Sequence, residues 1–310
     1  MVDSLQKIEE EVIDQLSLNK ARMTLVDKDR SNILLDSMTN PTRAAGGSAA
    51  NTAYWVAQLG GDVGFIGKIS DDVIGKQFKE SVKESGLKDY TVFESEDNQT
   101  GHCAIFITPD GERTMNTYLG AGAHLSIEDL DEKAIDSAEI LYMEGYLWDR
   151  PTSKEAFLHA AKLNKLSGGK NAITLSDVFC VEMHRDSFIK FIKESIDFVF
   201  CNEEEIMALS KKETTDEAFA YFKLEFPNLE ELVCTLGPDG AVVISKGQKV
   251  HYDATEAEVV DKTGAGDYFA AGYLYGLQKK LSIEESADIA NRSAAHVISE
   301  VGVRPNKNFS

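Results

Sequence analysis

The sequence lacks several patterns that mark common functional classes. Its four cysteines, Cys103, Cys180, Cys201 and Cys234, lie far apart with no CxxC spacing, which argues against a zinc cluster or a redox motif. No apolar run approaches the roughly 20 residues of a membrane helix. The acidic N-terminal segment has no apolar core of a secretory signal. We therefore expect a cytoplasmic protein with reduced thiols and no membrane partner.

Basic residues are scarce as well. The 310 residues include 32 Lys and Arg against 52 Asp and Glu, a formal net charge of −20. Nucleic acids and anionic membranes bind basic surfaces, so neither is expected as a partner. A local anion site stays open, because backbone N–H groups bind phosphate without any net charge.

The common nucleotide and hydrolase fingerprints are also missing. The sequence has no GxxxxGK[ST] loop, no GxGxxG turn opening a helix after the first strand, no HExxH and no GxSxG. These absences argue against four classes of protein: a P-loop ATPase, an ordinary dinucleotide dehydrogenase, an HExxH zinc protease and an α/β-hydrolase.

What the chain does contain is a regular alternation of apolar runs with helix-length segments. The runs 140–143, 172–175, 198–201 and 232–236 follow this pattern, which is typical of a parallel sheet covered on both faces. Further strands are expected near 63–66 and 259. Helices are expected at 49–59, 74–82, 267–279 and 283–299, and residues 5, 8, 12 and 16 have helical spacing.

Two segments, near 18–45 and 91–120, interrupt this alternation. The second contains a hairpin turn at 109–111, Pro-Asp-Gly. Since no linker or internal repeat divides the chain, we predict a single α/β domain over 1–310 with a small β insertion. Such an insertion can form a lid over the carboxyl ends of parallel strands, where these sheets bind ligands.

A glycine-rich turn, DKTGAGD at 261–267, precedes an apolar helix. Two glycines one residue apart allow a sharp turn with consecutive N–H groups, and the helix N-terminus adds partial positive charge. This is an anion hole. An aspartate beside it suits a base that takes a proton from a hydroxyl attacking phosphorus. An ordinary helix N-cap uses the same residue types.

Four motifs together resemble the ribokinase-like (PfkB) family of sugar and nucleoside kinases. They are GGSAAN at 46–51 with Gly67 and DDVIG at 71–75, NEEE at 202–205, TLGPDG at 235–240, and DKTGAGD at 261–267. They follow the family's order and cover nearly the whole chain. The resemblance implies a three-layer α/β/α fold with a mostly parallel central sheet and a small β lid.

The resemblance also implies roles for single residues. Asp267 would be the catalytic base, and the N–H groups of Gly264, Ala265 and Gly266 would stabilise the transferring phosphoryl group. ATP would be the co-substrate, bound by Asn202, Thr235, Gly237, Gly240 and Asn291. Glu205 would hold Mg²⁺ through water, and Asp261 resembles a ligand of a monovalent cation such as K⁺.

On the acceptor side, the resemblance implies binding by Asp3, Gly47, Ser48, Asn51, Arg113, Glu144 and Tyr146. Carboxylate and amide groups suit hydroxyls, and an aromatic face suits a purine. Tyr146 also fits plain core packing, and ribokinases place a carboxylate near Glu144 to read ribose.

The GGSxxN pattern and the hairpin at 108–114 look closer to adenosine kinases than to ribokinases. The first expectation is therefore transfer of the ATP γ-phosphoryl group to the 5′-hydroxyl of adenosine. A sugar kinase acting on ribose or fructose is the alternative. A non-catalytic nucleoside- or nucleotide-binding protein is a hypothesis of another class. The assembly is expected to be a monomer or a homodimer.

One departure from the family pattern concerns the first strand. Family members carry a glycine in a strand before the substrate aspartate, and residues 1–3 supply only the end of it. We expect either a start internal to the gene product or a chain that lacks a central strand and exposes the neighbouring strand edges.

Overall fold

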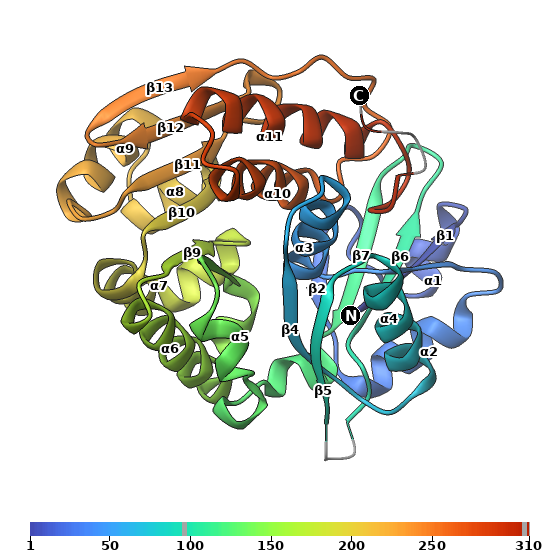
Figure 1. Ribbon diagram of the computed structural model, residues 1–310. Coiled ribbons are helices and arrows are strands. Elements are labelled where there is room, and N and C mark those ends of the chain that lie inside the picture. Colours follow the sequence, from blue (N-terminus) through green and yellow to red (C-terminus); the bar gives the residue numbers. More distant parts are fainter. Residues whose placement is uncertain (95–97, 306–308, 310) are drawn as a thin grey trace.

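The computed structural model describes residues 1–94, 98–305 and 309, and three β-sheets organise them (Figure 1). The largest sheet has six strands. In spatial order they are β13 (Gln248–Tyr252), β12 (Ala241–Ser245), β11 (Glu231–Thr235), β10 (Phe198–Asn202), β9 (Lys170–Thr174) and β8 (Ile140–Glu144). The strands β8 to β11 are parallel, while β12 and β13 form an antiparallel edge.

Helices cover both faces of this six-stranded sheet, because its central strands bury apolar side chains toward both faces. Along β10, Val199 and Cys201 pack into one cluster with helices α6 to α9, and Phe198 and Phe200 pack into another with α3, α10 and α11. The first group is α6 (Pro151–Leu166), α7 (Val178–Ser195), α8 (Glu203–Ser210) and α9 (Thr215–Glu225). The second is α3 (Ser48–Gln58), α10 (Ala265–Gln278) and α11 (Ile283–Ile298).

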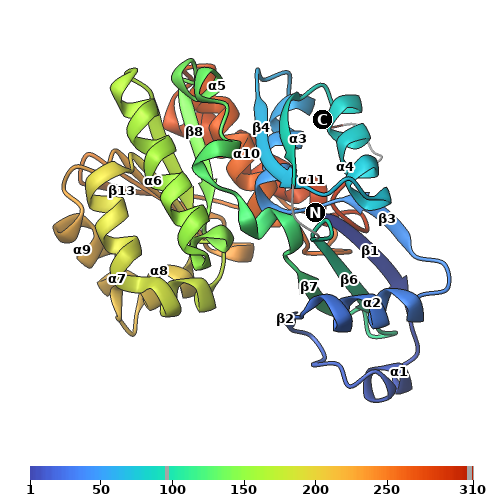
Figure 2. The same cartoon turned by 90° about the horizontal axis from the view of Figure 1, so that it is seen from below.

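A mixed five-stranded sheet stands apart from the first, in the lower right of Figure 2. Its order is β2 (Met23–Leu25), β7 (Arg113–Tyr118), β6 (His102–Ile107), β1 (Val2–Lys7) and β3 (Thr42–Ala45). Apolar side chains from β6 pack against α1 (Glu11–Gln15) and α2 (Lys28–Ser37). The segments 18–45 and 91–120 thus supply four of its strands, and a lid function for the sheet stays a prediction.

The third sheet pairs β4 (Gly64–Ile69) with β5 (Lys88–Phe93), beside α4 (Val73–Glu84). Among the described residues, β4 pairs only with β5, and β8 pairs only with β9. Residues of both β4 and β8 line one cavity, and each of these strands has one edge that pairs with no other described strand.

Helices α10 and α11 approach closely along a glycine seam. A Cβ atom at Gly272 would lie 2.7 Å from the Cα of Ala290, and one at Gly276 would lie 2.3 Å from the Oγ of Ser286. Only glycine fits such contacts without moving the backbone. The seam therefore fixes the helix that begins at the glycine-rich turn.

The predicted α/β class with a mostly parallel sheet is confirmed, but two local expectations are wrong. Residues 2–7 form β1, and the helix in this region is limited to 11–15, because pairing with β3 and β6 outweighs the helical spacing. The residues near 259 are not a strand. The hairpin β12–β13 forms instead at 241–252.

The remaining elements are short. They are α5 (Glu132–Asp136) and the 3-10 turns η1 (Gly120–His124), η2 (Ile127–Asp129), η3 (Gly145–Asp149) and η4 (Gly237–Asp239). All four cysteines are buried and unpaired. Within the described part of the chain, no helix has the length and apolar character needed to cross a membrane.

Candidate active site

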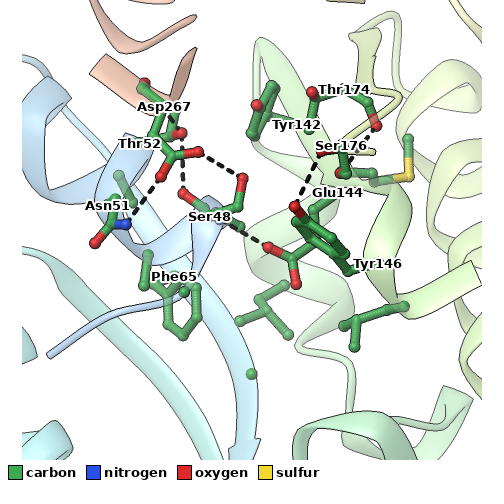
Figure 3. Close-up of a pocket in the computed structure, with 18 of the residues that line it drawn as sticks. Ser48, Asn51, Thr52, Phe65, Tyr142, Glu144, Tyr146, Thr174, Ser176 and Asp267 are labelled. Carbon is green, nitrogen blue, oxygen red and sulfur yellow. Dashed lines mark hydrogen bonds between the residues drawn. The ribbon is translucent and has the colours of Figure 1, made fainter. Parts of the chain in front are cut away.

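A cavity of about 1070 Å³ lies where the three sheets meet. It collects predicted site residues from six separate regions of the sequence, and Figure 3 shows several of them facing one another. Those that line it are Asp3, Gly47, Ser48, Asn51, Glu144, Tyr146, Asn202, Glu205, Thr235, Gly264, Ala265, Gly266 and Asp267. A concave site with convergent polar groups is the usual form of an active site.

Asp267, in the first turn of α10, faces the cavity with both carboxylate oxygens hydrogen-bonded (Figure 3). Its Oδ1 accepts a hydrogen bond from Ser48 Oγ at 2.7 Å, and its Oδ2 accepts one from Asn51 Nδ2 at 2.9 Å. Burial raises the pKa of Asp267 from 3.8 to about 6, while these two donors act in the opposite direction. A pKa of about 6 suits a group that accepts a proton near neutral pH.

The glycine-rich turn has the expected form at the N-terminus of α10. Gly264 has φ +79°, and a Cβ atom there would lie 2.9 Å from Val303 Cγ1, so glycine is required. A Cβ at Gly266 would meet no heavy atom within 4 Å, which shows open space above the helix end. The N–H of Ala265 donates to the carbonyl of Lys262 at 3.3 Å. The turn thus combines positive helix-end potential with access for an anion.

Asp3, on β1, is a second buried carboxylate of the cavity. Burial raises its pKa to about 6, and the amino group of Met1 and Arg304 act against this. A Cβ at the neighbouring Gly46 would lie 2.2 Å from Asp3 Oδ2, so the glycine leaves room for this carboxylate. The charge of Asp267 also raises the pKa of Asp3, and both carboxylates line the same cavity.

Glu144, the last residue of β8, and Tyr146, in the turn η3 that follows, lie on the opposite wall (Figure 3). Glu144 Oε2 accepts a hydrogen bond from the N–H of Ala49 at 2.8 Å, and burial raises the pKa of Glu144. The hydroxyl of Tyr146 donates to the carbonyl oxygen of Ser176 at 3.0 Å. With its hydroxyl held in this way, Tyr146 borders the cavity as an aromatic wall rather than as core packing alone.

Asn202 and Glu205 begin α8 with a capping box. Asn202 Oδ1 accepts from the N–H of Glu205 at 2.8 Å, and Glu205 accepts from the backbone and side-chain nitrogens of Asn202 at 3.1 and 2.9 Å. Burial raises the pKa of Glu205 to about 7. Thr235, at the end of the adjacent strand, lines the same part of the cavity. The NEEE motif therefore has a helix-start role and also presents a buried carboxylate to the cavity.

Five predicted residues lie outside the cavity lining. Gly237 and Gly240 form the turn between β11 and β12, both with positive φ. Asn291, on α11, donates from Nδ2 to the carbonyl of Asp253 at 3.0 Å. Arg113 and Asp261 form an ion pair with each other, so each has a protein partner that the sequence did not indicate. Their predicted roles toward ATP, acceptor and cation stay predictions.

Some residues at the site were missed by the sequence analysis. Arg304 donates from an Nη to Asn51 Oδ1 at 2.9 Å. Thr52 Oγ1 donates to the backbone carbonyl of Asp267 at 3.2 Å, and Phe65 of β4 lines the cavity. Thr52 follows the GGSAAN motif directly, which is a usable signal. Arg304 lies after the last helix in a segment with no motif.

Comparison with known proteins places these features in a family. A family model described as pfkB family carbohydrate kinase matches residues 16–308. The chain is similar to the crystal structure of adenosine kinase from Sinorhizobium meliloti, with 36% identity, a TM-score of 0.90, and coverage of 100% of this chain and 94% of that one. A probable sugar kinase from Rhizobium etli CFN 42 has 34% identity and a TM-score of 0.90, covering 99% and 93%.

Among curated proteins, a probable chloroplastic fructokinase-6 from Arabidopsis thaliana is 31% identical over 248 residues. This alignment spans 78% of this chain and 64% of that protein, less than two thirds of its length. The relatives thus act, by their names, on a nucleoside or on sugars, and all are kinases. The chain belongs to the pfkB family of carbohydrate kinases and is a phosphotransferase with an alcohol group as acceptor.

Proposed function

We propose that the protein transfers the γ-phosphoryl group of ATP to the 5′-hydroxyl of adenosine. The observation that carries the proposal is the pair of hydrogen bonds that aim Asp267 into the cavity beside the glycine-rich turn. Family membership favours this catalytic reading over a non-catalytic nucleotide-binding protein. The Tyr146 ring on the cavity wall and the 36% identity to an adenosine kinase support a nucleoside as the acceptor.

The chemistry follows from the positions of these groups. Asp267 takes the proton of the acceptor hydroxyl as its oxygen forms a bond to the γ-phosphorus. The bond from that phosphorus to the bridging oxygen breaks, and ADP leaves. The N–H groups at the start of α10 stabilise negative charge on the transferring group. Because phosphoryl transfer needs mainly positioning and electrostatics, this small set of groups is sufficient.

Mg²⁺ suits the residues around Glu205. The carboxylate is buried yet lines the cavity, and the amide of Asn202 lies next to it. Mg²⁺ keeps most of its waters and needs only one or two carboxylates. This agrees with the described residues, which contain no group of three or more His, Cys, Asp or Glu side chains able to hold a metal. When bound, the ion would neutralise charge on the ATP phosphates, held through water by Glu205.

A sugar acceptor is the second candidate function. Glu144 supports it, because a half-buried carboxylate that lines the cavity suits the hydroxyls of ribose or fructose. The sugar-kinase relatives support it as well. The two candidates differ in whether the apolar wall around Tyr146 and Phe65 holds a purine or stays outside the contact with the acceptor.

An ATP-consumption assay over adenosine, ribose and fructose tests the proposal. We expect adenosine to give the highest kcat/KM, and Asp267→Asn to abolish turnover while ATP still binds. Asp186→Asn is the matched control, since Asp186 is almost fully exposed and far from the cavity. A sugar that outperforms adenosine would move the assignment to the second candidate. Retained turnover in Asp267→Asn would remove the proposed base.

A further inference from the structure

Arg304 is joined to Asp267 through one side chain. Its guanidinium donates to Asn51 Oδ1 at 2.9 Å, and Asn51 Nδ2 donates to Asp267 Oδ2 at 2.9 Å. The three side chains come from the segment after α11, from α3 and from α10. A cation, an amide and a carboxylate are thus linked in series within a buried part of the site.

The guanidinium is held in place by more than the amide. It lies over the ring of Tyr54, with 4.1 Å from its central carbon to the ring centroid, and it donates to the carbonyl of Val303 at 2.6 Å. Tyr268 donates its hydroxyl to the same carbonyl at 2.8 Å. Stacking on an aromatic face and a planar set of donors suit arginine specifically. The position of Arg304 is therefore defined from three sides.

This arrangement determines which way the Asn51 amide points. An amide has one end that accepts and one that donates. With the guanidinium at the oxygen, the NH2 group must face Asp267. Without the guanidinium, the amide can rotate and bring its oxygen toward the carboxylate, which favours the protonated form of Asp267.

We propose that Arg304 is a positioning residue, which fixes the Asn51 amide so that its NH2 group keeps Asp267 ionised and aimed at the acceptor hydroxyl. The inference rests on the proposed function, since it assigns Asp267 the role of base. Arg304 acts through Asn51 and does not itself touch the reacting atoms.

Other charged and titratable groups face Asp267 and bear on its protonation. Ser48 donates to it directly, and Asp3, Glu144 and Tyr142 interact with it electrostatically. Lys262 lines the same cavity. Arg304 also acts on Asp267 by its charge, and burial opposes ionisation. Among the described residues, Asn51 and Ser48 are the two side chains that donate hydrogen bonds to the Asp267 carboxylate, so loss of one donor is a large perturbation.

The test compares the dependence of kcat on pH at saturating ATP and acceptor. In Arg304→Met we expect the acid limb to move up by about one pH unit, a loss of about tenfold at pH 5.5 and little change at pH 8.5. Arg304→Lys keeps a charged donor, so the acid limb of its pH profile should lie close to that of the wild type. Arg292→Met is the control, because Arg292 lies on α11 over the ring of Phe309, and in the described part of the chain no hydrogen bond joins it to Asn51.

A double-mutant comparison separates positioning from general support of the fold. If Arg304 acts through Asn51, Arg304→Met should add little further shift in an Asn51→Ala background. A purely structural arginine would lower kcat equally at all pH values and leave the limb in place. That result, or an equal shift in the Asn51→Ala background, overturns the proposal.

A second readout does not depend on turnover. The ¹³Cγ resonance of Asp267, assigned by its loss in Asp267→Asn, can be titrated in the protein without substrates. Its midpoint should rise in Arg304→Met and stay in Arg292→Met. If no acceptor is phosphorylated but the midpoint moves, the proposed function fails while the link from Arg304 to Asp267 stands. An unmoved midpoint overturns the link itself.

Discussion

Arg113, at the start of β7, forms an ion pair with Asp261, the residue that opens the glycine-rich turn. The side chains are 12% and 2% exposed. Asp261 also accepts from the N–H groups of Thr263 at 3.0 Å and Gly302 at 2.6 Å. The five-stranded sheet and the turn before α10 are therefore tied together by a buried charge pair.

Removing the cation of this pair should cost far more than removing both partners. Arg113→Met leaves a buried carboxylate without its counter-charge, and we expect a loss of about 3 kcal/mol in unfolding free energy. The double variant Arg113→Met, Asp261→Asn should recover most of it. Urea denaturation at pH 7 measures both. A loss below about 1 kcal/mol in the single variant would show that the pair acts like an exposed one.

The ionised Asp267 carboxylate should lower the free energy of unfolding at pH values above its pKa. The folded-state pKa of Asp267 is raised from 3.8 to about 6, so the folded state holds this proton more tightly than the unfolded state. The stability from that proton is present below about pH 4 and is lost as the pH rises through 6. The change in pKa from 3.8 to about 6 corresponds to about 3 kcal/mol in the free energy of unfolding.

Asp267→Asn should accordingly be more stable than the wild type at pH 8, with the gap closing near pH 4. The measurement is the unfolding free energy of both proteins at several pH values. Because the comparison is between two proteins at the same pH, the other titrating groups cancel. A gap that grows toward acid would contradict the raised pKa of Asp267.

Gly46 should control the affinity for the acceptor. Gly46→Ala would place a Cβ 2.2 Å from Asp3 Oδ2, so the carboxylate must move. We expect KM for the acceptor to rise by about tenfold or more, with KM for ATP little changed. Gly122→Ala is the control, since its Cβ would meet nothing closer than 3.8 Å. If the two substitutions changed KM for the acceptor equally, Asp3 would have no role in binding the acceptor.

Tyr146 should separate nucleoside from sugar binding. Its hydroxyl is bound to Ser176, so Tyr146→Phe keeps the ring and Tyr146→Leu removes it. We expect Tyr146→Leu to weaken the binding of adenosine by about 1 kcal/mol or more, because the aromatic ring that stacks on the base is lost. Tyr146→Phe should cost less, and ribose should respond to neither. Steady-state KM values for both acceptors decide this, and an equal loss for ribose would place the ring at the sugar.

Much of the fold could be predicted because the central strands contain apolar runs whose side chains face both sides of the sheet. The runs containing Val199 and Val233 indicate a doubly covered sheet without any knowledge of partners. The strand β1 escaped prediction because Asp3 and Ser4 interrupt its apolar pattern, although both are buried. Its place depends on pairing with β3 and β6, which are distant in sequence.

The site was predictable to the extent that glycine motifs define backbone shape. Gly264 needs its positive φ, and Asp267 follows at a fixed spacing on the helix. Arg304 belongs to irregular chain after α11, where no periodicity or turn pattern applies. Its contact with Asn51 spans 253 positions and arises only from the tertiary fold.

The glycine seam between α10 and α11 has a consequence for genetics. Gly272 and Gly276 lie one to three turns beyond Asp267 and contact α11 rather than the cavity. A larger side chain at either position would push α10 away from its neighbour and carry the aspartate with it. In a screen for inactive variants, substitutions at Gly272 and Gly276 would therefore be found alongside substitutions in the glycine-rich turn, although neither glycine lines the cavity.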